Sequence, residues 1–155
     1  MLKFIRSVVL VSILLNGLTA LAEDITPPIN VHKSAEQGDV KAQARLAAMY
    51  LLGSEVDKDE QQAFEWFLKS AQQGNVEAEM IVAAMYERGL GVKNDIKLAT
   101  QWYEKAAAKG NTTALALTGK NDVAKGGVAF NYQTMRLSAA KQIPTEYAKK
   151  ILLTK

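Results

Sequence analysis

The sequence predicts an all-α protein in which pairs of helices stack into an α/α solenoid, or superhelix, that ends in a degenerate repeat and a capping helix. Two observations predict this class. The chain is self-similar with a period of 36 residues, which is the length of a helix-pair repeat. Within each period, apolar residues recur at helical spacing between polar capping residues and glycines. A single helix pair cannot bury such stripes, so neighbouring pairs must stack.

The repeat is visible in several residue types at once. Gly38, Gly74 and Gly110 are spaced by 36 residues. Between the first two copies the match is dense, and the matched pairs include Ala42 with Ala78, Met49 with Met85, Tyr50 with Tyr86, Asp59 with Asp95 and Trp66 with Trp102. Chance does not place two tryptophans and two Met-Tyr pairs at one spacing, so the copies are structural units.

Each unit contains the signals for two helices. In the first copy, Asp39 begins one helix and Gly53 ends it, while Asp59 begins the next and Gly74 ends it. The buried stripes that these limits enclose are Ala42, Leu46 and Tyr50 in the first helix, and Ala63, Trp66, Phe67, Ser70 and Ala71 in the second. The small residues let the helices approach closely, and the aromatic residues fill the space between pairs.

At these positions the chain resembles the Sel-1-like repeat family, a relative of the tetratricopeptide repeats. The second copy follows the family pattern at Ala78, Tyr86, Gly89-Leu90-Gly91-Val92, Asp95, Ala99, Trp102-Tyr103, Lys105-Ala106-Ala107 and Gly110. The first copy departs from it where Glu55 replaces the second loop glycine and Gln62 replaces a lysine. The resemblance implies a helical solenoid over residues 39–110 and says little about the partner.

We therefore divide the chain into five segments. They are a signal peptide (1–22), an N-terminal segment and cap (23–38), repeat 1 (39–74), repeat 2 (75–110), and a degenerate third repeat with a C-terminal capping helix (111–155). In the last segment one helix is expected near 131–141, and a separate final helix is expected to start at Pro144-Thr145. Atypical terminal units are what a solenoid needs to cover its open ends.

The first residues have the pattern of a cleavable bacterial export signal. Lys3 and Arg6 precede an uncharged apolar run over residues 8–15, and Ala20-Leu21-Ala22 supplies small residues before a cleavage site at Glu23. The apolar run is shorter than the roughly 20 residues that span a bilayer. We expect the mature protein in the periplasm or outside the cell, with no stable membrane insertion after cleavage.

Charge is distributed unevenly along the chain. Residues 23–104 contain 8 Lys and Arg against 14 Asp and Glu, whereas residues 105–155 contain 9 against 2. The two parts are either solvated faces or, for the basic part, a docking end for an anionic partner or for lipid head groups. Nucleic acid is not an expected partner, because the chain carries an export signal and no aromatic residues alternate with its basic ones.

The residues needed for catalysis or for metal binding are scarce. His32 is the only histidine and there is no cysteine, so neither a nucleophile-histidine site nor a zinc site is expected, and no cofactor is expected. Asp57, Asp59 and Glu60 form the densest acidic cluster. The cluster either serves an envelope hydrolase, our third hypothesis, or stabilises a helix N-terminus. We favour the second interpretation and expect no enzyme.

The favoured function is therefore binding of a protein or peptide. The residues beside the buried stripe of the first helices form the expected partner-binding strip: Arg45, Met49, Leu52, Ile81, Met85, Arg88 and Leu117. The alternative for these residues is that several of them pack against neighbouring helices. Our first hypothesis is a periplasmic scaffold or adaptor that docks an envelope protein. The second is an immunity protein that neutralises a toxin, such as a lipase effector, delivered into the periplasm.

Overall fold

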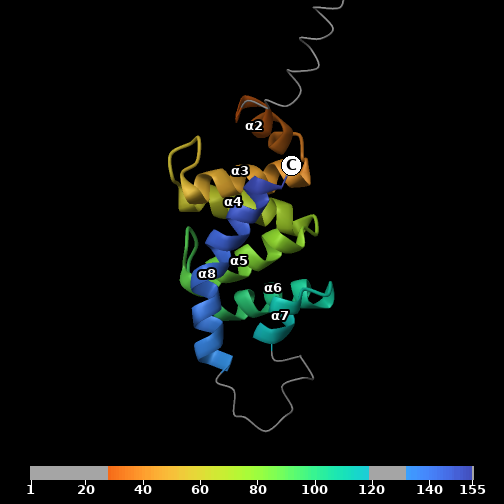
Figure 1. The fold of residues 1–155 in the computed structure, drawn as a ribbon, viewed down its shortest axis with the longest axis vertical. Coiled ribbons are helices and arrows are strands. Elements are labelled where there is room, and N and C mark those ends of the chain that lie inside the picture. The colour runs from red at the N-terminus through yellow and green to blue at the C-terminus, as the bar shows by residue number, and fades with distance from the viewer. Residues whose placement is uncertain (1–27, 119–131, 155) are drawn as a thin grey trace, which may run out of the picture.

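The computed structural model describes residues 28–118 and 132–154, and within these ranges every regular element is a helix (Figure 1). Repeat 1 comprises α3 (Val40–Leu52) and α4 (Glu60–Gln72), and repeat 2 comprises α5 (Val76–Arg88) and α6 (Ile96–Ala108). They are preceded by α2 (Pro28–Glu36) and followed by α7 (Thr112–Leu117) and α8 (Tyr132–Leu153). The predicted fold class, an α/α solenoid, is confirmed. The predicted signal peptide and residues 119–131 lie outside the described residues.

The helix starts predicted within the two repeats are correct, and each has a side-chain cap. The Asp39 carboxylate accepts the Ala42 amide at 2.6 Å, and the Asp59 carboxylate accepts the Gln61 and Gln62 amides at 2.9 and 3.0 Å. In repeat 2, Asn75 and Asp95 cap α5 and α6 in the same way. These side chains satisfy backbone donors that the first turn of a helix leaves without partners.

The first helix of each repeat ends at a glycine in the left-handed conformation. Gly53 has φ 68° and Gly89 has φ 71°, and the two amides donate to Met49 and Met85 respectively. The loops that follow are closed alike, since the Asp59 amide donates to the Tyr50 carbonyl at 3.0 Å and the Asp95 amide to Tyr86 at 2.9 Å. The two copies are thus equivalent in backbone geometry as well as in sequence.

The core lies between the helix pairs and consists of alanines and large aromatic side chains. Phe67 and Tyr103 are fully buried, and Trp66 and Trp102 are each 8% exposed. The ammonium groups of Lys69 and Lys105 lie 3.7 and 3.8 Å from the ring centres of the two tryptophans. The lysines therefore cover the outer face of each indole with a cation–π contact that repeats from one unit to the next.

The helix before repeat 1 takes the place of a second helix from a preceding unit. α2 packs against α3, and the buried Gln43 side chain of α3 donates to the Ala35 carbonyl at 3.1 Å. The same Gln43 side chain accepts a hydrogen bond from Gln73 at 2.7 Å. One buried amide therefore joins α2, α3 and the end of α4, which satisfies polar groups that burial would otherwise penalise.

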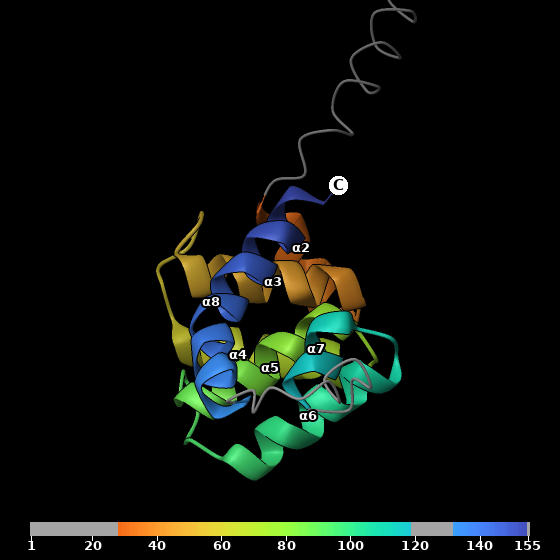
Figure 2. The ribbon, with the colours of Figure 1, turned by 60° about the horizontal axis from the view of Figure 1, so that its bottom comes forward.

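The C-terminal region differs from the expectation of two separate helices. α8 is a single helix of 22 residues with Pro144 inside it. The proline removes one backbone hydrogen-bond donor from the helix, but its ring is fully buried. Figures 1 and 2 show α8 running from the α6–α7 end of the stack back to α2 and α3, so that it lies along the repeats. No helix in the described part of the chain is both long and apolar enough to cross a bilayer.

Candidate interaction site

The first helices of the repeats, α3 and α5, form the inner face of the stack, and α8 covers this face. α8 packs against both helices and also touches α7. Its contribution to the core is a stripe of apolar side chains at helical spacing, namely Ala140, Ile143, Ala148 and Ile151. In a solenoid the inner face is commonly the binding surface, and here the chain fills most of that surface with its own last helix.

The residues of the expected partner-binding strip are consequently divided. Met49, Ile81, Met85 and Leu117 are buried in the core, and Leu52 packs partly buried against it. These five are therefore unavailable to a partner in this conformation, as the alternative interpretation anticipated. Their burial has a physical cause. A strip of methionine and aliphatic side chains is unfavourable in water, so an amphipathic helix that packs over it stabilises the folded chain.

The two arginines of the strip remain accessible. Arg88 is exposed at the end of α5, and its guanidinium donates to the Lys141 carbonyl of α8 at 3.4 Å. Arg45 is half-buried on α3 and lies at the margin of the region that α8 covers. Of the predicted strip, Arg45 is the member best placed to meet another molecule.

Ion pairs hold α8 at both of its ends. Near its start, the Arg136 Nε lies 3.0 Å from the Glu87 carboxylate of α5, and both side chains are largely buried. Near its end, the Lys150 Nζ lies 2.6 Å from Glu77, which is at the other end of α5. The hydrogen bond from Lys150 to Glu77 raises the pKa of the lysine. The two pairs join the two ends of α5 to α8.

The inner pair belongs to a buried polar network. The Tyr103 hydroxyl donates to the Glu87 carboxylate at 3.2 Å, and the Arg136 guanidinium lies over the Tyr103 ring and donates to the Thr100 hydroxyl at 2.8 Å. Burial raises the pKa of Glu87, although Arg136 and Tyr103 oppose that shift. Burial and the neighbouring Glu87 carboxylate also raise the pKa of Tyr103. The phenol is thus a hydrogen-bond donor at any physiological pH, and the network joins α5, α6 and α8.

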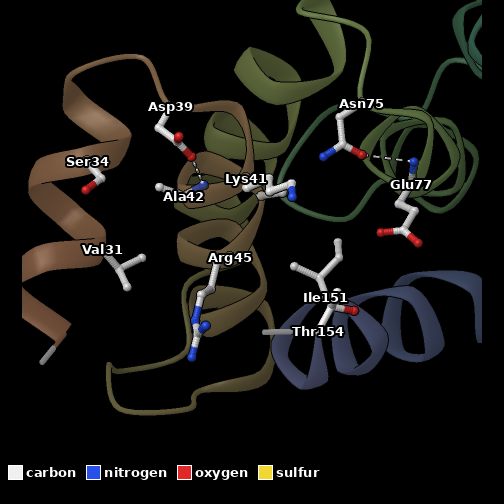
Figure 3. A pocket seen from close by; sticks show the side chains of 11 residues that line it. Val31, Ser34, Asp39, Lys41, Ala42, Arg45, Asn75, Glu77, Ile151 and Thr154 are labelled. Carbon is white, nitrogen blue, oxygen red and sulfur yellow. Dashed lines mark hydrogen bonds between the residues drawn. The ribbon is translucent and has the colours of Figure 1, made fainter. Parts of the chain in front are cut away.

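An open pocket of about 500 Å³ remains where α8 ends. We call it the end pocket; it lies between α2, α3, the start of α5 and the end of α8 (Figure 3). Its apolar lining consists of Val31, Ala42, Ala44 and Ile151, and its polar lining includes Ser34, Lys41, Arg45, Asn75 and Thr154. A pocket of this size holds a few side chains of a ligand.

The charges of the end pocket are not evenly compensated. Two carboxylates line it, but Asp39 caps α3 and Glu77 pairs with Lys150. The two cations, Lys41 and Arg45, have no acidic side chain within ion-pair distance among residues 28–118 and 132–154. The pocket therefore offers two cationic groups next to an apolar surface.

The acidic cluster in the first repeat has a structural role. Asp59 caps α4, as its counterpart Asp95 caps α6, and Glu60 pairs with Lys58 at 2.8 Å. Asp57 is exposed in the preceding loop. Within the described ranges, no group of three His, Asp or Glu side chains is close enough to hold a metal ion. This arrangement is what the helix-cap interpretation of the cluster predicts.

His32 is the remaining residue that was considered for catalysis. It lies half-exposed on α2, where its Nδ1 is 3.2 Å from the Glu36 carboxylate. Its ring also meets the edge of Trp66, with the ring centres 6.0 Å apart. Both contacts are those of a surface histidine that packs on a neighbouring helix. Among the described residues, His32 has no hydrogen bond with a hydroxyl group.

Sequence reasoning missed the end pocket and the covered inner face for one reason. Both depend on where α8 lies, and its apolar stripe fits either the end of the stack or the inner face. One signal was available, because the acidic Glu77 and Glu87 of α5 have basic counterparts in Arg136 and Lys150 of α8. The first carboxylate of α5 pairs with the second cation of α8 and the second carboxylate with the first cation, an order that antiparallel helices require.

Comparison with known proteins agrees with this architecture. The Sel1 repeat model matches residues 40–75 and 76–111. A Sel1 repeat protein from Oxalobacter formigenes is 41% identical, with a TM-score of 0.56, over 59% of this chain and 68% of that chain. A protective antigen of uropathogenic Escherichia coli strains, which displays an SLR fold, is 31% identical with a TM-score of 0.58. That match covers 80% of this chain and 27% of the antigen.

No curated protein matches the chain. The family assignment therefore depends on the repeat model and on the two crystal structures, and all three agree with the repeated helix pairs described above. The chain belongs to the Sel1 repeat family.

Proposed function

We propose that the protein is a non-catalytic interaction module of the periplasm, a scaffold or adaptor that binds a partner protein at the end pocket and the adjoining surface of α2 and α3. Sel1 repeat proteins are generally protein-interaction modules, which supports the class of function. The observation that carries the location is Arg45, a half-buried cation that forms no ion pair with the described acidic residues and lies beside an open, largely apolar pocket. Arginine is enriched at protein interfaces.

Site-specific photo-crosslinking in living cells tests this proposal. The photoreactive residue p-benzoylphenylalanine would replace Ser34 or Thr154 at the end pocket, and Gln101 or Lys97 on the exposed side of α6 as matched surface positions. We expect discrete adducts with an envelope protein at the first two positions and none at the other two. A chain that yields no adduct at any of the four positions would contradict an interaction role.

The periplasmic location is a separate part of the proposal. It depends on the export signal of residues 1–22 and predicts that the mature chain starts at Glu23. Cell fractionation should place the chain in the periplasmic extract, and N-terminal sequencing should begin at Glu23. A chain recovered from the cytoplasm with Met1 intact would contradict this part and leave the binding role to be judged by crosslinking.

An immunity protein that neutralises a toxin delivered into the periplasm is the second candidate. The resemblance of small exported Sel-1-like proteins to such immunity proteins supports it, and so does the end pocket, which presents preformed charge to a partner. If a toxin gene neighbours this one, co-expression should relieve the toxicity of its product, and Arg45→Glu should weaken the relief. Full relief by the variant would assign the toxin to another surface.

A further inference from the structure

We infer, on the basis of the proposed function, that the end pocket recognises a short acidic and aliphatic peptide segment of the partner protein. In this arrangement a carboxylate of the segment pairs with Arg45, Lys41 adds positive charge from one turn earlier on α3, and a neighbouring aliphatic side chain covers Val31 and Ile151. The inference goes beyond a general interaction role because it names the chemistry of the bound segment and the residues that select it.

The charges that line the end pocket favour an acidic ligand. The two carboxylates of the lining are already engaged, Asp39 by the Ala42 amide and Glu77 by Lys150. Lys41 and Arg45 are not paired with any acidic side chain of the described residues. An incoming carboxylate meets two cations that form no ion pair within residues 28–118 and 132–154, whereas the lining carboxylates already accept a backbone amide or pair with a lysine. The pocket therefore selects for negative charge.

The partial burial of Arg45 strengthens this argument. Its side chain rises from α3 between Val31 of α2 and the end of α8 (Figure 3), so apolar groups flank the guanidinium. A carboxylate bound there would be partly removed from water, and ion pairs gain strength as water is excluded. The planar guanidinium also presents several donors to one carboxylate.

The apolar lining supplies the second argument. Val31 and Ile151 are 9% and 8% exposed and Ala44 is buried, so the edges of Val31 and Ile151 and the half-buried Ala42 form the apolar surface that a ligand can reach. These groups stand next to the cations, so a ligand that carries charge alone would leave them uncovered. An aliphatic side chain beside the acidic residue would bury them and gain about 25 cal/mol per Å² of apolar surface covered.

Two polar groups are placed to hold a peptide backbone. The Asn75 carbonyl oxygen accepts the Glu77 and Ala78 amides, and Figure 3 shows its amide nitrogen directed toward the side of Lys41. Ser34 lines the pocket from α2. Both groups can donate to peptide carbonyls. A volume of about 500 Å³ accommodates two or three residues in this way and is too small for a whole helix.

Selection from a phage-displayed library of random peptides tests the inference. The full mature chain would be the target, and peptides synthesised from the enriched sequences would be labelled and measured by fluorescence anisotropy. We expect sequences with Asp or Glu next to Leu, Ile or Val. Arg45→Glu should weaken their binding about tenfold or more, as loss of a charge-assisted hydrogen bond implies. Lys97→Glu, a matched charge change on α6, should have no effect.

A second pair of variants tests the pocket without altering charge. Ser34→Tyr fills the pocket and should abolish binding, while Ser138→Tyr places the same side chain on the exposed side of α8 and should not. Circular dichroism melting curves establish that each variant is folded. Enriched peptides that lack acidic residues, or that bind Arg45→Glu and Ser34→Tyr normally, would overturn the inference.

The outcome is also separable from that of the proposed function. If a partner crosslinks to the chain while acidic peptides do not compete with it, the interaction role stands and the peptide inference fails. Vesicles of anionic phospholipid are the alternative source of negative charge. Equal retention of the mature chain and of its Arg45→Glu variant on such vesicles is expected, and a loss of retention in the variant would assign the pocket to lipid and overturn the inference.

Discussion

At the scale of single residues, the two loop positions Glu55 and Gly91 show how a repeat protein tolerates departures from its own pattern. Both have φ 65°, in the left-handed region that favours glycine. A Cβ on Gly91 would lie 1.9 Å from the Glu60 carbonyl oxygen, since the loop of repeat 2 packs on the first turn of α4. Glu55 occupies the equivalent position at the edge of the stack and is exposed. Glycine is therefore required inside the stack but not at its edge.

Gly91→Ala should consequently destabilise the fold strongly. The left-handed conformation costs about 1–2 kcal/mol for an alanine, and the contact with the Glu60 backbone adds overpacking of about 1–3 kcal/mol. Gly110→Ala is the control, because Gly110 has φ 86° but open space around its Cβ position, so only the conformational cost applies. Urea denaturation measures both. Equal losses would show that the close approach to α4 is unimportant.

The opposite change in repeat 1 should be stabilising. Glu55→Gly removes the strain of a left-handed glutamate and should raise the free energy of unfolding by about 1 kcal/mol, reduced somewhat by the greater freedom of glycine in the unfolded chain. The same urea titration detects this gain. A lower midpoint for the variant would mean that the Glu55 side chain makes a contribution that offsets its backbone strain.

At the scale of helices, α8 covers the inner face of the stack, the surface where a solenoid commonly binds a partner. Its apolar stripe meets α3 and α5, and its cations meet Glu77 and Glu87 at the two ends of α5. The two pairs differ in environment. The Lys150–Glu77 pair is solvent-accessible and contributes little, whereas Glu87 is buried and depends on Arg136 and Tyr103 for compensation.

The Glu87 network makes stability depend on pH in a defined direction. Burial raises the pKa of Glu87 above its ordinary value near 4.5. Below that value the carboxyl is protonated in both states. As the pH rises toward the raised pKa, the unfolded state ionises first, so the folded state loses stability. Relative to Glu87→Gln, the natural chain should therefore be most stable below about pH 4.5 and lose that advantage as the pH rises.

Urea denaturation of the two chains between pH 3.5 and 7 checks this prediction, because the difference between them isolates Glu87 from the other carboxyl groups. A difference in unfolding free energy that stays constant over this range would contradict the raised pKa. A difference that grows in favour of the natural chain with increasing pH would mean that Arg136 lowers the pKa of Glu87 more than burial raises it.

Removing α8 should expose the inner face. A chain that ends at Thr118 retains α2–α7 but uncovers Met49, Ile81 and Met85, so it should bind a hydrophobic dye and self-associate. A synthetic peptide of residues 132–154 should reverse both effects. The same peptide with Ile143→Asp and Ile151→Asp is the control and should not. A truncated chain that stays monomeric and binds no dye would show that α8 is dispensable for covering this face.

At the scale of the whole molecule, the uneven distribution of charge along the chain finds an internal explanation. Acidic residues of repeat 2 pair with basic residues that follow in the sequence: Glu77 with Lys150, Glu79 with Lys109, and Glu87 with Arg136. Three cations of the basic part therefore satisfy the chain's own carboxylates. The cations at the end pocket, Lys41 and Arg45, come instead from the acidic part, where overall charge gave no indication of them.

The repeat architecture was predictable from the sequence because its signals act between residues that are close in the chain. The interaction site was not predictable, because it depends on contacts between residues that are far apart in the chain. Caps such as Asp39 and Asp95 act over three residues, and the repeat multiplies each local signal. The burial of Met49 and Ile81, in contrast, depends on a helix that follows them by more than 50 residues. An amphipathic stripe predicts that a helix packs against another element, but it does not predict which element.

The path of α8 has a further consequence for how the molecule unfolds. Stacked repeats ordinarily contact only their neighbours, so an array can fray from one end while the other end persists. Here the last helix contacts both repeats and ends beside α2. The first and last described helices therefore lie next to each other. Loss of either terminus thus loosens the other, and the protein should melt in one cooperative step, unlike an open array.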